Sequence, residues 1–142
     1  MTEQQPTTDT HDMSWFLKRL ADEKGVLHAL LVTGDGLVRA RSKDLGRDVA
    51  DPTAASTAGL LSLATTFAEF AQAPAGTTVG KIIIDMPEQC VLVFRAGDNT
   101  VLAVAVGAPM TSPEVGVASS AAIKAIKGMA PALAAAERTR TP

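Results

Sequence analysis

The amino-acid sequence predicts an α/β domain of the α+β type, in which one five-stranded antiparallel sheet carries helices on both faces. Short turns separate segments in the order helix, two strands, helix, three strands, helix (αββαβββα). Two strands, Leu27–Thr33 and Val101–Ala108, are apolar on both faces and belong in the centre of the sheet. The chain has 142 residues, of which 46% are hydrophobic and 20% charged, enough for one domain with a real core.

Three segments have the spacing of apolar residues that is typical of helices. The first runs from Met13 to Lys24, with Asp12 as its cap, and the last begins near Pro113. The second runs from Pro52 to Gln72, because an acidic cap followed by proline suits a helix start. Its apolar stripe is predicted to face the sheet and consists of Leu60, Leu63, Phe67 and Phe70.

The remaining segments predict a hairpin and a meander. Leu37–Ser42 pairs with the first strand across a Gly-Asp-Gly turn, and its two arginines suit a sheet edge. Thr78–Met86, Gln89–Ala96 and Thr100–Ala108 follow one another through short turns. With the two apolar strands central, the spatial order is 2-1-5-4-3 and the third strand forms the other edge.

Composition and termini exclude several classes of protein. The net charge is -2 and aromatic residues make up 4%, so we expect no nucleic-acid partner. A single cysteine and two histidines exclude an internal disulfide and a structural zinc site, and we expect no cofactor or metal. The opening residues are polar and acidic, unlike a signal peptide, and no stretch approaches the roughly 20 apolar residues of a membrane span.

We therefore expect a cytoplasmic protein that reaches a membrane, if at all, through a partner. Residues 1–11 are expected to form a disordered N-terminal tail, residues 12–136 the domain, and residues 137–142 a frayed C-terminal tail.

The predicted edge strand is unusually apolar. Ile82, Ile83 and Ile84 are flanked only by Lys81 and Asp85. An exposed edge of this kind favours pairing with another chain, and two-fold homodimers are the commonest oligomers. On the second helix, small residues around Gly59 favour close approach of another helix, or equally of the chain's own sheet.

Motifs for catalysis are largely missing from the sequence. The Gly-x-Gly of the hairpin turn is followed by a strand, so it lacks the helix of a phosphate-binding loop. Cys90 and His28 leave a small cysteine enzyme as an alternative, although a buried small thiol and a strand-face imidazole are the favoured explanation. Arg39 and Arg41 suit either a phosphate grip or a solvated edge, and Trp15 suits either the core or a partner contact. An arginine finger from Arg41 or Arg47 is not selected by any spacing.

The order of core and turn segments from Trp15 to Leu133 resembles the Roadblock/LC7 family, a longin/profilin-like fold. The resemblance is to members found in actinobacterial conservon operons beside a small Ras-like GTPase. It is carried by Ser14-Trp15-Phe16-Leu17, Val26–Val32, Asp35-Gly36-Leu37, Ala55–Ala64, Ile84-Asp85-Met86, Val91-Leu92-Val93, Gly97-Asp98, Leu102-Ala103-Val104 and Val115-Gly116-Val117. Two positions depart from the family pattern: Ala58 stands where a serine is common, and glycine is common near Cys90.

The resemblance implies one helix on one face of the sheet and two on the other. It also implies a homodimer that joins third strands and second helices, through Lys81, Ile82, Ile83, Ile84, Asp85, Gly59, Leu60 and Leu63. The outer residues of the paired helices, among them Ser56, Leu61 and Glu69, would then form a partner surface. Leu61 is expected there either as a contact between the helices or as an exposed anchor.

The resemblance further implies a protein that is not an enzyme and has no catalytic residue of its own. It implies a regulatory scaffold that binds a small Ras-like GTPase and modulates its nucleotide cycle. The alternative is a ligand-sensing or scaffold module in a complex with a sensor histidine kinase.

Overall fold

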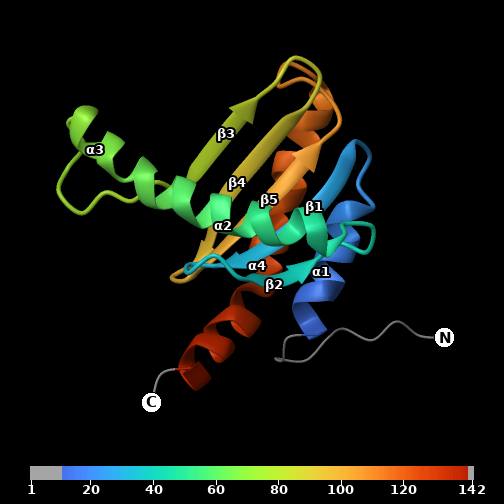
Figure 1. Cartoon of the computed structure of the whole chain (residues 1–142), viewed down its shortest axis with the longest axis horizontal. Coiled ribbons are helices and arrows are strands. Elements are labelled where there is room, and N and C mark those ends of the chain that lie inside the picture. Colours follow the sequence, from blue (N-terminus) through green and yellow to red (C-terminus); the bar gives the residue numbers. More distant parts are fainter. Residues whose placement is uncertain (1–10, 141–142) are drawn as a thin grey trace.

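The structure is a computed structural model that describes the backbone of residues 11–140 and the side chains of residues 13–135. Its elements are α1 (His11–Ala21), β1 (Val26–Thr33), β2 (Val38–Arg41), α2 (Arg47–Ala64), α3 (Thr66–Phe70), β3 (Lys81–Asp85), β4 (Cys90–Gly97), β5 (Thr100–Val106) and α4 (Pro113–Arg140) (Figure 1). The strands form one antiparallel sheet in the order β2-β1-β5-β4-β3, which confirms the predicted fold class and topology. Within residues 11–140, no helix is long and apolar enough to cross a membrane.

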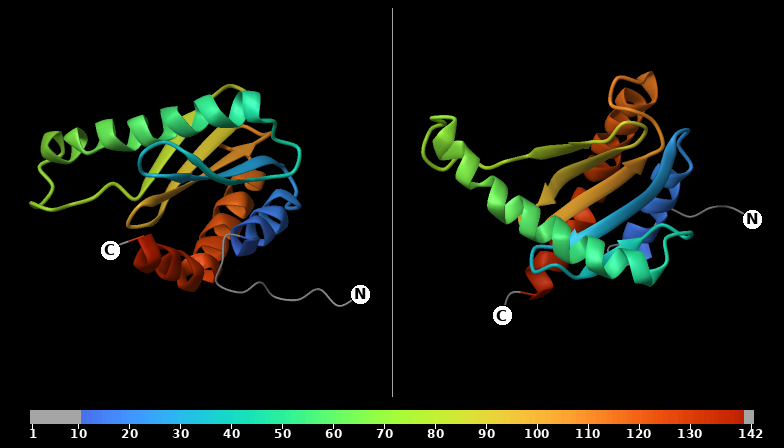
Figure 2. Two further views of the ribbon diagram at one scale, coloured as in Figure 1. Left: turned by 60° about the horizontal axis from the view of Figure 1, so that its bottom comes forward. Right: turned by 45° about the horizontal axis from the view of Figure 1, so that its top comes forward.

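The sheet separates two layers of helices, with α1 and α4 on one face and α2 on the other (Figure 2). Alternate residues of the central strands point to opposite faces, so both faces acquire a core. Leu31 and Leu102 pack with Met129 on the α1–α4 side, whereas Leu30 and Val32 pack beneath α2. This arrangement explains why the central strands carry apolar residues on both faces.

The β1–β2 turn depends on glycine for a steric reason. Gly36 has a φ of 87°, and a Cβ atom there would lie 3.2 Å from the Cα of Ala55 in α2. The turn is also closed by the backbone N–H of Leu37, which donates to Thr33 Oγ1 at 3.1 Å. The hairpin turn therefore fixes the approach of α2 to the sheet as well as the strand pairing.

The observed bounds differ from the predicted ones mainly at the helices. α2 begins at Arg47, capped by Gly46, and contains Pro52 on its exposed side instead of starting there. α1 ends at Ala21, before the predicted Lys24, and β3 begins at Lys81 instead of Thr78. α4 runs to Arg140, so the predicted C-terminal tail of residues 137–142 overlaps its last turn, and residues 1–10 and 141–142 lie outside the described residues.

Candidate functional site

The β3 edge has no partner strand within the described chain and is apolar. β3 hydrogen-bonds to β4 on one side, with Ile83 opposite Leu92. Ile83 and Ile84 are each 38% exposed, and Met86, just beyond the strand, is 37% exposed. Lys81 and Asp85 are both exposed at the two ends of the strand. This edge combines free backbone hydrogen-bonding groups with apolar side chains, the features that favour addition of another strand.

The face that α2 turns to the sheet is not the predicted one. Ala50, Ala54, Thr57 and Leu61 are its buried residues. Of the predicted inner stripe, Leu63 is 67% exposed, and Phe67 and Phe70 are exposed on α3. The prediction of an inner Leu60–Phe70 stripe is therefore wrong. Small side chains at positions 50, 54 and 57 let α2 approach the sheet closely, which leaves the larger residues outside.

Leu61 was predicted on the outer face of α2, and this prediction is also wrong. Its side chain is 5% exposed and packs beneath α2 with Leu30, Val32 and Val93. Ser56 is exposed on α2, and Glu69 is exposed on α3 rather than on the same continuous helix. Ser56 and Glu69 are thus available to a partner, whereas Leu61 is a core residue.

The predicted second helix is interrupted where two threonines follow each other. Thr65 Oγ1 donates to the carbonyl of Ser62 at 2.7 Å, and Thr66 Oγ1 donates to that of Leu63 at 2.9 Å. Threonine side chains that bond back to carbonyls of the preceding turn favour bends in helices. The chain resumes as the short helix α3 and turns back at Gln72, a non-glycine residue with a φ of 57°.

The end of α2, α3 and the following loop form an arm, residues 63–80, that extends past the β3 edge of the sheet (Figures 1 and 2). Two aromatic rings of this arm face solvent: Phe67 is 63% exposed and Phe70 is 86% exposed. Leu63, at the start of the arm, is 67% exposed, so three large apolar side chains of this arm face solvent next to the apolar β3 edge. Apolar surface concentrated in this way is typical of a protein–protein contact.

The two residues of the cysteine-enzyme alternative do not meet. Cys90 is fully buried in the core on the α1–α4 side. His28 pairs with Ala105, which is itself opposite Val91 on the α2 side of the sheet. Burial raises the pKa of the Cys90 thiol, and the Asp85 carboxylate raises it further against the opposing effect of Lys81. The thiol is therefore a poor nucleophile in this fold.

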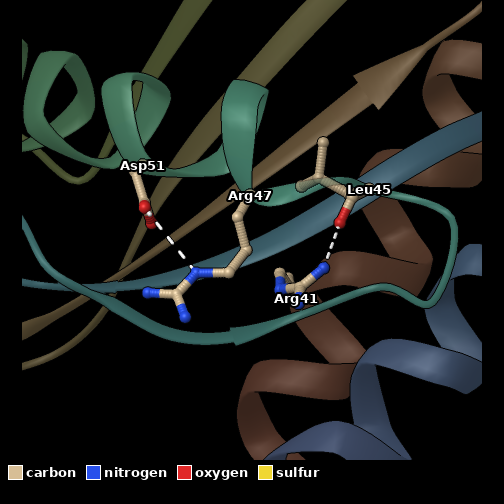
Figure 3. Close-up of polar contacts among 4 residues, drawn as sticks. All are labelled: Arg41, Leu45, Arg47 and Asp51. Atoms are coloured by element: carbon tan, nitrogen blue, oxygen red, sulfur yellow. Dashed lines mark hydrogen bonds and ion pairs between the residues drawn. The ribbon is translucent and has the colours of Figure 1, made fainter.

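The arginines considered for anion binding have partners inside the protein. Arg39 Nη1 donates to Thr100 Oγ1 at 3.0 Å. Arg41 Nη1 donates to the carbonyl of Leu45, and Arg47 Nε lies 3.7 Å from Asp51 Oδ2 in an exposed ion pair (Figure 3). The Arg41 bond fastens the loop before α2 to β2, the Arg39 bond joins β2 to β5, and the Arg47–Asp51 pair lies within the first turns of α2. No group of three or more metal-ligating side chains occurs among the residues that the structure describes.

Comparison with known proteins agrees with this geometry. The sequence profile of the Roadblock/LC7 domain matches residues 15–105. A Roadblock/LC7 domain from Streptomyces avermitilis is 27% identical, with a TM-score of 0.73 over 84% of this chain and 96% of that one. The fold is also that of Myxococcus xanthus MglB, with 16% identity and a TM-score of 0.69 over 81% of this chain and 89% of that one.

The gliding protein MglB of Thermus thermophilus is similar at 18% identity and a TM-score of 0.72, covering 87% of this chain and 90% of that one. No curated protein sequence matches the chain. The profile covers well over half of the sequence, and the sheet order and helix layers agree with the matched structures. The chain belongs to the Roadblock/LC7 family.

Proposed function

We propose that this protein is a homodimeric, non-enzymatic regulator that binds a small Ras-like GTPase and modulates its nucleotide cycle, as in a conservon-type system. The observation that carries the proposal is the apolar β3 edge beside the exposed aromatic arm. Large apolar side chains exposed together are suited to contacts with other proteins. MglB, to which the fold is similar, includes a form described as having a tetrameric arrangement.

The sequence of β3 is complementary to itself. If two copies pair antiparallel about a two-fold axis at Ile83, then Lys81 of each copy lies opposite Asp85 of the other. The two residues lie on the same face of the sheet, because they pair with Phe94 and Cys90 of one core. Opposite charges in directly facing positions stabilise an antiparallel pair, whereas like charges destabilise it. The pairing thus matches charges as well as apolar residues.

Exchange of charges at this strand tests the pairing. Lys81→Asp creates two facing pairs of carboxylates, and we expect it to weaken the dimer by about two- to tenfold. Lys81→Asp combined with Asp85→Lys restores the facing charges and should restore the dimer. Lys81 Nζ also donates to Ser119 Oγ at 3.2 Å, so Ser119→Ala is the control for loss of that contact. Analytical ultracentrifugation gives the dimer constants, and a folded wild-type monomer at micromolar concentration contradicts the proposal.

The proposed dimer brings the two copies of α2 together on one face of the combined sheet. The C-terminal ends of the two helices lie nearest the two-fold axis (Figure 1), and the exposed Ser56 lies further along each helix, next to the Ala55 that contacts the β1–β2 turn. A single asymmetric GTPase bound across that axis gives one GTPase per dimer. Glu69 lies on the arm that extends past the β3 edge, on the side where the second copy is proposed to bind (Figure 1).

The partner is tested with a Ras-like GTPase encoded in the same operon, loaded with GDP or with a GTP analogue. We expect a pull-down in at least one nucleotide state and a changed hydrolysis or exchange rate. Ser56→Arg should abolish binding, whereas Ser120→Arg, which alters an exposed serine on the opposite layer, should not. Failure of the wild-type protein to bind in either state contradicts the GTPase assignment, and full binding by Ser56→Arg contradicts the docking surface.

A further inference from the structure

A cavity of about 340 Å³ lies between α1 and α4, on the face of the sheet opposite to α2. The α1 wall of the cavity carries large side chains and the α4 wall carries small ones. α1 contributes Trp15, Phe16 and Leu20, whereas α4 contributes small residues, including Ala121 and Ala125. Two helices packed through large residues on one side and alanines on the other leave room between them near the surface. The volume is at the lower end of the range for small-molecule sites.

The aromatic wall of this cavity is held in place from three directions. The rings of Trp15 and Phe16 meet edge to face, with centroids 4.8 Å apart at 86°. The guanidinium carbon of Arg19 lies 5.1 Å from the centroid of the Trp15 ring. Phe16 also lies directly against Gly128, where an added Cβ atom would be 2.5 Å from its ring. The rings therefore form a preorganised apolar surface rather than a mobile flap.

The charges around the cavity are predominantly positive. Arg19 on α1 and Lys124 on α4 line it from opposite sides, and Glu23 is the single carboxylate among the lining residues. Among the described residues, neither Lys124 nor Glu23 forms an ion pair. An anionic group placed between Arg19 and Lys124 gains two favourable charge interactions, against one unfavourable interaction with Glu23.

We propose that this cavity binds a small organic carboxylate that carries an aromatic or branched aliphatic group. The apolar group packs between the Trp15–Phe16 pair and the alanines of α4, and the carboxylate lies between Arg19 and Lys124. α1 packs on β1 and β2, far from the β3 edge, so a ligand here is bound without using the dimer surface. The protein then senses a metabolite on one layer while it contacts protein partners on the other.

A matched set of ligands tests the charge preference. 3-Phenylpropionate, 3-phenylpropan-1-ol and 3-phenylpropylamine have the same apolar group and differ in charge. Trp15 is the single tryptophan of the chain, so its fluorescence reports occupancy of the cavity directly. We expect the acid to bind about two- to fivefold more tightly than the alcohol, and the amine to bind most weakly. Equal binding of the three compounds, binding led by the amine, or no binding of the acid contradicts the proposal.

Two pairs of variants locate the ligand. Ala125→Leu fills the cavity and should abolish the response, whereas Ala130→Leu adds the same atoms at an exposed position of the same helix. Lys124→Gln should remove most of the preference for acid over alcohol, whereas Lys127→Gln, exposed and outside the lining, should retain it. An unchanged response in Ala125→Leu, with its circular dichroism spectrum intact, contradicts the site. The dimer mass, measured in parallel, separates this result from failure of the proposed dimer.

Discussion

Leu61 and Leu63 provide a matched pair of substitutions that tests which face of α2 is free to bind a partner. Both are leucines on the same helix, yet Leu61 is 5% exposed and Leu63 is 67% exposed. Leu61 packs in the α2-side core with Val93 and Val101. Leu63 belongs to the arm that we assign to the dimer. Truncation of each to alanine therefore removes the same atoms from opposite sides of one helix.

The magnitudes follow from the burial. Truncation of a buried leucine to alanine costs about 2–5 kcal/mol, because transfer free energy is lost and a cavity remains. For a domain of this size, about 3 °C per kcal/mol converts this cost to a fall in melting temperature of about 6–15 °C. Leu63→Ala should change the stability of the monomer by less than about 0.5 kcal/mol, as is usual for exposed positions. Its effect should instead appear as weaker dimerisation.

Urea titrations followed by circular dichroism, repeated over a range of protein concentrations, distinguish the two effects. A loss of core packing is independent of concentration, whereas a loss of dimer contacts becomes smaller as the wild-type protein itself dissociates. Leu61→Ala should therefore shift the midpoint at every concentration, and Leu63→Ala only where the wild type is dimeric. A large effect of Leu63→Ala at the lowest concentration, or none of Leu61→Ala, would refute the assigned faces of α2.

Three further predictions concern residues outside these surfaces. Cys90→Ala should keep the dimer and partner binding. Burial raises the pKa of the wild-type thiol, so Cys90 should react slowly with iodoacetamide in the folded protein. The unfolded chain releases the same proton at lower pH, so the contribution of Cys90 to stability should decline above a pH of about 8.5, as measured by urea titration. Gly36→Ala should cost about 1–3 kcal/mol, since it strains a positive φ and pushes against Ala55; unchanged stability contradicts the turn geometry. Thr33→Val should cost about 1–2 kcal/mol in the same assay, because it removes a donor to Asp35 and an acceptor for Leu37.

The sheet order could be predicted because burial on two faces leaves a clear signal in the sequence. Residues 29–32 and 101–106 are apolar at consecutive positions, and the structure pairs these segments at the centre, with Leu31 opposite Leu102. Hairpins between consecutive strands then leave few arrangements for the others. The candidate edge follows from the same reasoning. β5 pairs with β1, so β4 and β3 lie beyond β5 in turn, and β3 is left at the edge.

The orientation of α2 could not be predicted in the same way. Periodicity identifies an apolar stripe but does not say what covers it. α2 carries a stripe of large residues and a stripe of small ones, and the sheet covers the small one, with Leu61 as its one large member. An apolar stripe that binds a partner protein has the same spacing along the helix as one that packs on the chain's own core. The error in placing Leu61 outside and Leu63 inside is thus a consequence of a helix with two contact faces.

The cavity between α1 and α4 was beyond the reach of the sequence for a different reason. Trp15 was recognised as either a core or a contact residue, but its partners on α4 follow more than 100 residues later in the chain. Arg19 and Lys124 carry no local signal of acting together, because each is an ordinary solvent-facing position on its own helix. Sites made between distant elements depend on packing geometry, which local patterns do not contain.

The distribution of aromatic residues connects the two proposed surfaces. The chain has four phenylalanines, one tryptophan and no tyrosine, and Phe94 alone among them is buried. Trp15 and Phe16 line the cavity between α1 and α4, and Phe67 and Phe70 face solvent on the arm. Burial of a phenylalanine side chain stabilises a protein by about 1.5–3 kcal/mol. The isolated chain gains little of this free energy from Phe67 or Phe70, which are both exposed on α3. The exposed rings of Phe67 and Phe70, beside a core made mainly of aliphatic residues, are the arrangement expected when binding, rather than folding, is what these two rings stabilise.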